Sequence, residues 1–224
     1  MNIYGGIMKI FEFLIIILIS ISVIMLNNTL ANDHNGPGCS IDLNIETHLY
    51  DQGITTKDIE TKVYAKKDQI IWLAVVAQNV SNLDSYQFDL LYDPEELSYV
   101  GSMEENQMEF EIMNILKKND GVTIGFQCYL IEPGKINIAN TMTGDDEQKA
   151  PEGSGVLAII GFKTLTNYPN ARLTLANVLF IDSSNNQAVV QHLSHADIGY
   201  DMDLNRGKHT LADLIYLLRV LSNY

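Results

Sequence analysis

The chain has 224 residues, 28 of them acidic and 14 basic, which gives a formal net charge of −14 at pH 7. Such an acidic surface excludes proteins that bind nucleic acid or anionic membranes mainly through charge, because both ligands are themselves negative. The length and the 46% content of hydrophobic residues suit one domain of ordinary size with short segments beside it.

The first 31 residues have the layout of a secretory signal peptide. Lys9 precedes an apolar run, interrupted only by serines, from residue 14 to residue 26, and Thr29, Leu30 and Ala31 follow it. A helix of that run rises about 20 Å, short of the roughly 30 Å hydrocarbon core of a bilayer. We therefore predict cleavage after Ala31, a secreted or cell-surface protein, and no membrane contact after cleavage. A retained membrane anchor is the alternative.

Residues 32 to 57 are predicted to be a linker and lead-in, since they begin with the polar, Gly- and Pro-containing sequence NDHNGPGCS. The chain has two cysteines, Cys39 within this segment and Cys128 farther on. An exported protein can keep a disulfide. A Cys39–Cys128 bridge and two free thiols both stay open at this point.

Residues 58 to 200 carry the pattern of an all-β domain. Turn sequences such as NDG, EPG, PEGSG and NYPN separate short apolar or alternating runs. The runs that we expect to be strands are residues 69–78, 85–92, 97–102, 122–130, 135–139, 156–164 and 173–181. Many short strands at this spacing indicate a sandwich or barrel rather than alternating strands and helices.

The run from Ser85 to Tyr92 alternates strictly, so it is predicted to have one buried and one outward face. The inward set is Tyr86, Phe88, Leu90 and Tyr92. The outward set is Ser85, Gln87, Asp89 and Leu91. Asp93 and Pro94 end the strand, because proline lacks the donor that a sheet needs.

Two stretches resemble the cohesin domain family. LAVVAQNVSNLDSYQFDLLYDPEELSYVG, residues 73–101, is similar to three successive strands of a cohesin, and APEGSGVLAIIGFKTL, residues 150–165, to its Gly-rich turn and the following strand. The resemblance implies a jelly-roll β-sandwich of about nine strands. It also implies a non-catalytic receptor for dockerin modules on partner proteins, in assemblies that degrade polysaccharides.

In that family dockerins bind a sheet face that includes the strand before Tyr-Asp-Pro. Carried onto this chain, the resemblance assigns partner binding to Ser85, Gln87, Asp89 and Leu91. Related folds serve as carbohydrate-binding modules, so a module that binds polysaccharide is the alternative function. The partner is thus a dockerin-bearing protein or a polysaccharide.

The C-terminal segment, residues 201–224, resembles one repeat of a dockerin, an EF-hand-like loop followed by an α-helix. The apolar stripe of that helix includes Leu211, Leu214, Ile215, Leu218 and Leu221. Candidate calcium ligands are Asp201, Asp203, Asn205 and Asp213. Neither frame of the loop closes: counted from Asp203, Gly207 comes one position early, and counted from Asp201, Arg206 takes the glycine position. No required cofactor is predicted, and calcium at this loop stays an alternative.

Motifs for catalysis are missing from the sequence. There is no G-x-S-x-G, no P-loop and no H-E-x-x-H. His192 and His195 are three residues apart, a spacing that places them on opposite faces of a strand. We predict that the protein is not an enzyme.

Overall fold

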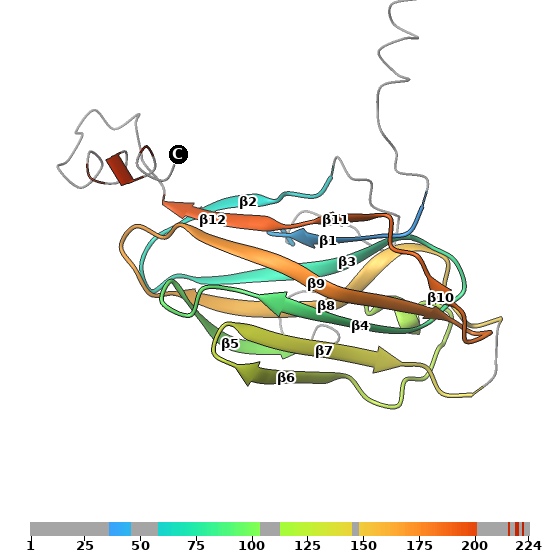
Figure 1. Cartoon of the computed structure of the whole chain (residues 1–224). Helices are drawn as coiled ribbons and strands as arrows, with labels where there is room; N and C mark the ends of the chain where they lie inside the picture. Colours follow the sequence, from blue (N-terminus) through green and yellow to red (C-terminus); the bar gives the residue numbers. More distant parts are fainter. Residues whose placement is uncertain are drawn as a thin grey trace, which may run out of the picture. The chain divides into compact units, whose positions relative to one another are not determined.

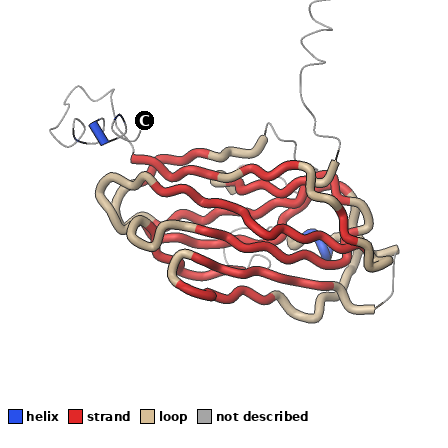
Figure 2. The backbone as a smooth tube through the Cα atoms, viewed as in Figure 1, coloured by secondary structure: helices blue, strands red, loops and turns tan. Residues whose placement is uncertain are grey.

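The computed structural model describes residues 36–45, 58–103, 113–144 and 148–200, together with positions 215, 218, 219 and 221. Contacts divide the chain into two units at Asp33 and His34, and every described residue belongs to the second unit. Strands dominate the described part of that unit (Figure 2). The prediction of an all-β fold is therefore confirmed.

Twelve strands and one short 3-10 helix, η2, make up the described regular structure. In chain order they are β1 (Gly38–Asp42), β2 (Lys62–Ala65), β3 (Ile70–Val80), β4 (Leu83–Leu91), β5 (Leu97–Met103), η2 (Ile115–Lys117), β6 (Gln127–Glu132), β7 (Lys135–Thr141), β8 (Gly153–Thr164), β9 (Ala171–Asp182), β10 (Gln187–Ala188), β11 (His192–Ser194) and β12 (Ala196–Tyr200). The count of about nine strands that the resemblance implied is wrong: the described residues form twelve, which include the short strands β10 and β11 of two and three residues.

The strands form two sheets (Figure 1). One has five strands in the order β11-β1-β3-β8-β5. The other has seven, in the order β2-β12-β9-β4-β7-β6, with β10 paired to β9. Neighbouring strands are antiparallel except for the β1–β11 and β2–β12 pairs, which are parallel. Consecutive strands β3 and β4 lie in different sheets, so the chain crosses the sandwich between them.

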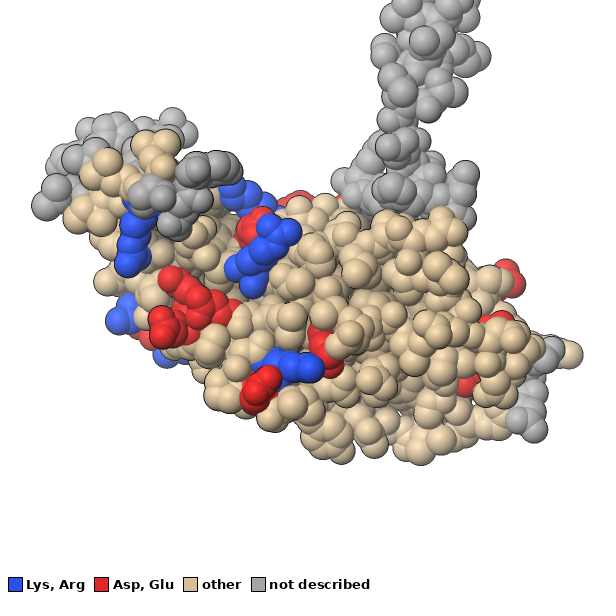
Figure 3. All heavy atoms as spheres, in the orientation of Figure 1, with Lys and Arg blue, Asp and Glu red and all other residues tan. Residues whose placement is uncertain are grey.

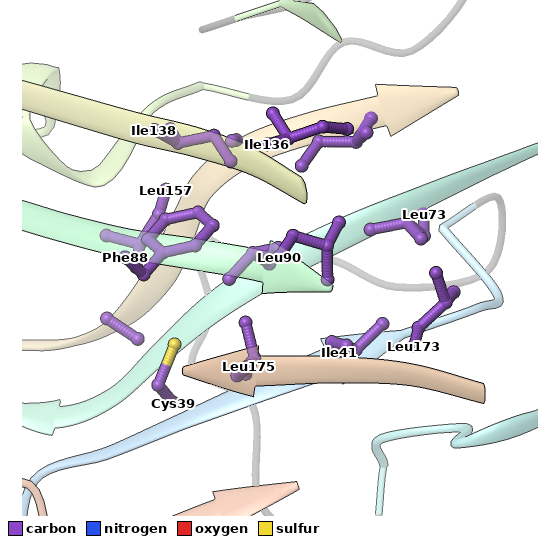
Figure 4. Close-up of a cluster of buried hydrophobic side chains, with 14 of the residues drawn as sticks. Cys39, Ile41, Leu73, Phe88, Leu90, Ile136, Ile138, Leu157, Leu173 and Leu175 are labelled. Carbon is purple, nitrogen blue, oxygen red and sulfur yellow. The ribbon is translucent and has the colours of Figure 1, made fainter. Parts of the chain in front are cut away.

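The core lies between the two sheets (Figure 4). Tyr86, Phe88 and Leu90 of β4 are at most 2% exposed, which confirms the predicted inward face. They meet Leu73 of β3 and Leu157 of β8 in the same buried cluster. Each large apolar side chain buried in this way contributes about 1.5–3 kcal/mol.

Residues 32–57, predicted to be a linker and lead-in, contain strand β1. Gly38–Asp42 pairs antiparallel with β3 from Gln78 to Ala74, inside the five-stranded sheet. The polar, glycine-containing sequence around this strand did not predict it, although Cys39 and Ile41 are fully buried. Of the two alternatives left open for the cysteines, the structure has free thiols at both Cys39 and Cys128.

Two predictions fall largely outside the described residues. The signal peptide, residues 1–31, lies outside them altogether. Of the C-terminal segment only Ile215, Leu218, Arg219 and Leu221 are described, and although each has helical backbone, they define no element. The predicted C-terminal α-helix is therefore not confirmed. Among the described residues, no helix combines the length and apolar character needed to cross a membrane.

Candidate docking face

The outward side of strands β9, β4, β7 and β6 forms one continuous surface, which we call the candidate docking face. These strands are neighbours in the seven-stranded sheet and lie side by side toward the viewer in Figure 1. On β4, Ser85 and Leu91 are half-buried and Gln87 is exposed, while Tyr86, Phe88 and Leu90 belong to the buried core cluster. Gln87 sits at the centre, opposite Ala139 of β7 and Leu179 of β9.

A polar network occupies one end of the face, around Asp89. Asn137 donates from Nδ2 to Asp89 Oδ1 at 2.7 Å, and Asn177 donates from Nδ2 to Oδ2 at 2.7 Å. Lys135 Nζ lies 3.1 Å from the same Oδ2. Asp89 thus faces outward as predicted, but it is only 5% exposed because its neighbours cover it.

The network determines the charge state of Asp89. Burial alone would raise the pKa of this carboxyl, but the hydrogen bonds from Asn137, Asn177 and Lys135 outweigh it and hold the pKa below its usual value. The carboxylate is therefore charged at neutral pH. Since all three neighbours act as donors, Asp89 organises this end of the face and has little accessible surface of its own.

A β-bulge in β9 supplies one of the three donors. Gln87 pairs with Leu179 and Asp89 with Ala176, so an extra residue is accommodated between them. Asn177 lies in this bulge with φ of 51°, a left-handed conformation that asparagine tolerates better than most residues. The bulge brings the Asn177 amide to Asp89.

The other end of the face is hollowed. The hollow has a volume of about 240 Å³. Its lining consists of Ser85, Tyr86, Gln87, Ile124, Gly125, Gln127, Ala139, Asn140, Thr141, Leu179 and Ile181. None of these residues is charged. The hollow lies over β4, β7 and β9, with the segment that leads into β6 along one side.

The hydroxyl groups of the hollow are engaged with one another. Ser85 Oγ lies 2.5 Å from Thr141 Oγ1 and donates to Asp84 Oδ2 at 2.7 Å. No histidine, cysteine or lysine lines the hollow to activate a nucleophile.

The four residues predicted for partner binding divide between the two ends. Ser85 and Gln87 line the hollow, Asp89 belongs to the polar network, and Leu91 lies beyond it, opposite Lys135 and Thr174. Reasoning from one strand missed the residues that the neighbouring strands and the Ile124 segment contribute. Their only sequence signal is that they occupy alternate positions of other predicted strands.

Metal and histidine sites are not apparent in the described part of the chain. Within it, no group of three or more His, Cys, Asp or Glu residues could hold a metal ion. The predicted calcium ligands Asp201, Asp203, Asn205 and Asp213 lie outside the described residues. His192 Nε2 is 3.3 Å from Gln78 Oε1, whereas His195 Nδ1 accepts from the Leu175 amide at 3.2 Å. The two histidines thus have different partners.

Comparison with known proteins identifies the fold. The family model described as "Cohesin domain" matches residues 59–198. The chain belongs to the cohesin domain family. That match ends before residues 201–224, so the dockerin-like repeat at the C-terminus has no support from it. No curated protein matches the chain.

Solved cohesin structures are similar to this cohesin. The sixth cohesin of Acetivibrio cellulolyticus scaffoldin B, in complex with a Cel5 dockerin mutant, is 16% identical with a TM-score of 0.51, covering 74% of this chain and 99% of its own. The Clostridium thermocellum OlpA cohesin, in complex with the dockerin Doc918, is 13% identical with a TM-score of 0.54, covering 75% of this chain and 100% of its own. The second type II cohesin of A. cellulolyticus ScaA is 18% identical with a TM-score of 0.53, covering 80% of this chain and 95% of its own. At such low identity the likeness shows the fold alone.

Proposed function

We propose that this cohesin is a non-catalytic receptor that binds a dockerin module of a partner protein through the candidate docking face. The observation that carries the proposal is the match of the cohesin family model to residues 59–198. Two of the similar structures are cohesins in complex with dockerins, which supports the same partner class. We further propose that the protein acts outside the cell, on the basis of the predicted signal peptide.

The chemistry of the face supports binding of a folded protein. Stable protein interfaces combine an apolar, well-packed centre with a polar surround. Here the half-buried apolar side chains Leu179 and Ile181 line a hollow beside the amide of Gln87. The Asp89 network lies at the other end, where it holds charged groups in fixed positions.

Carbohydrate binding is the less favoured alternative. Sugar rings stack on accessible aromatic faces, yet the single tryptophan, Trp72, packs against a second buried cluster that includes Ala74 and Val156. Tyr86, the aromatic residue beside the hollow, is 2% exposed and donates its hydroxyl to the Leu157 carbonyl. None of the residues that line the hollow therefore presents an accessible ring, and among the described residues of the face the one exposed ring is that of Tyr129 on β6, 57% exposed.

The direct test is titration of the purified full chain with a panel of purified dockerins, set beside a glycan array. We expect at least one dockerin to bind and no glycan to do so. The double substitution Gln87→Arg with Leu91→Arg should weaken that binding tenfold or more, because it places two cations on the face. Ile70→Arg is the matched control, since Ile70 is 52% exposed and lies on β3 in the other sheet. Equal affinity for the double variant and wild type would show that the face is wrong.

A further inference from the structure

Charge is distributed unevenly along the candidate docking face. In Figure 3 the lysine and arginine side chains of the visible surface gather with several acidic ones toward the end where β4 finishes and β7 begins, and a broad area beyond them is uncharged, with a few acidic side chains at its far margin. On the face itself, the charged end contains the ion pair of Asp89 and Lys135. The hollow lies at the opposite end, where β7 finishes at Thr141.

The rim of the hollow is also uncharged and apolar. Residues 121–131, GVTIGFQCYLI, contain no acidic or basic residue, in a chain where 19% of residues are charged. Within this stretch the side chains of Ile124 and Tyr129 are 71% and 57% exposed. Exposed sheet edges usually carry charged side chains that discourage contact. On this edge the single charged residue of β6 is Glu132 at its end, and residues 121–131 carry none, which is typical of a surface that a partner covers.

The hollow has room for one large side chain. An apolar cavity of about 150 Å³ accommodates a benzene molecule, and the hollow measures about 240 Å³. A carboxylate placed there would lose water without gaining a counter-ion, because no cation lines the hollow and the Asp84 carboxylate lies 2.7 Å from Ser85 Oγ. An apolar side chain would contact Ala139, Leu179 and Ile181 instead. The amides of Gln87 and Gln127 can orient the backbone around it.

We infer that the hollow receives one large, uncharged apolar side chain from the contacting surface of the dockerin, and that this contact selects among dockerins. The inference rests on the proposed function and adds the chemistry of the partner at one position. A side chain anchored in such a pocket typically provides much of the binding energy of an interface. Dockerins with a carboxylate at that position are excluded, whereas ion pairs belong to the Asp89 end.

The test fills the hollow without touching the polar network. Ala139→Phe places a ring in it, and Ala139→Ser is the control of nearly unchanged volume. Urea unfolding of both variants checks that the sandwich is intact. Against a dockerin that binds wild type, we expect Ala139→Phe to weaken affinity tenfold or more and Ala139→Ser to change it less than twofold.

A double-mutant cycle identifies the other half of the contact. Each exposed Leu, Ile, Val, Met and Phe of that dockerin is replaced by Ala, and binding to wild type and Ala139→Phe is compared. One replacement should cost wild type tenfold or more and cost Ala139→Phe much less. If Ala139→Phe binds like wild type while the double variant Gln87→Arg with Leu91→Arg does not bind, the inference about the hollow is overturned, but the proposal that the dockerin binds this face still holds. If wild type binds no dockerin of the panel, both proposals fall.

Discussion

Replacing Asp89 by Asn tests whether the polar network is as tightly organised as its geometry indicates. The carboxylate accepts from Asn137 and Asn177 at 2.7 Å each and lies 3.1 Å from Lys135 Nζ. Asparagine keeps the shape but turns one acceptor oxygen into a donor, which then faces another donor. A hydrogen bond to a charged group contributes about 1.5–3 kcal/mol, and a pair with a partly exposed lysine adds at most about 1 kcal/mol.

We therefore expect Asp89→Asn to lower the free energy of unfolding by about 2–3 kcal/mol at neutral pH. Urea unfolding followed by fluorescence of the single tryptophan, Trp72, measures it. The matched control is Asp68→Asn. Asp68 pairs with Lys163 at 2.7 Å but its side chain is 63% exposed, and its φ of 65° suits asparagine. The control should change stability far less.

The pH dependence gives the sign of the effect independently. Because the folded pKa of Asp89 is below its ordinary value, its contribution is present above the ordinary value, about 3.9, and is lost as the pH falls through the folded pKa. The difference in free energy of unfolding between wild type and Asp89→Asn should thus be constant from neutral pH to about pH 5 and should shrink below about pH 4. A difference under about 0.5 kcal/mol at neutral pH, or one that grows on acidification, would refute the reasoning.

Three further predictions concern the scaffold. Phe88→Ala, at a fully buried position, should lower the free energy of unfolding by about 3–5 kcal/mol in urea, and a loss below about 1 kcal/mol would mean that the core is packed differently. Gly134→Ala should lower the free energy of unfolding by about 1–3 kcal/mol, since the φ of Gly134 is 90° and an added Cβ would lie 2.9 Å from the Tyr92 carbonyl oxygen. An unchanged midpoint of urea unfolding would contradict the conformation of this turn. Burial raises the pKa of the Cys39 thiol, so Ellman's reagent should modify Cys128 alone until urea unfolds the chain. Two fast-reacting thiols in the native state would contradict the position of β1.

The alternating pattern of β4 could be predicted from sequence because its sheet has one face on the core and one away from it. Under that condition each apolar residue at every second position marks the buried side, as Phe88 and Leu90 do. The same logic failed for β1, which reads as a polar linker. All five residues of Gly38–Asp42 are buried, including Ser40 and Asp42, so they show no alternation.

The composition of the docking face could be predicted only in part. Ser85, Gln87, Asp89 and Leu91 follow from one strand, but the hollow needs residues that are far apart in sequence, such as Ile124 and Ile181. Which strands become neighbours depends on the topology of the sandwich, which periodicity does not specify. The bulge at Asn177 was hidden for a similar reason, because a single asparagine in an apolar strand does not reveal its partner.

The central claim is that a dockerin binds over β9, β4, β7 and β6, and methyl NMR of isoleucine tests it most directly. Ile124 and Ile181 line the hollow, whereas Ile70 is 52% exposed on β3 in the other sheet. On titration of the full chain with a bound dockerin, we predict that the methyl signals of Ile124 and Ile181 shift and that the Ile70 signal does not. A shift of Ile70 with Ile124 and Ile181 unmoved would contradict the account.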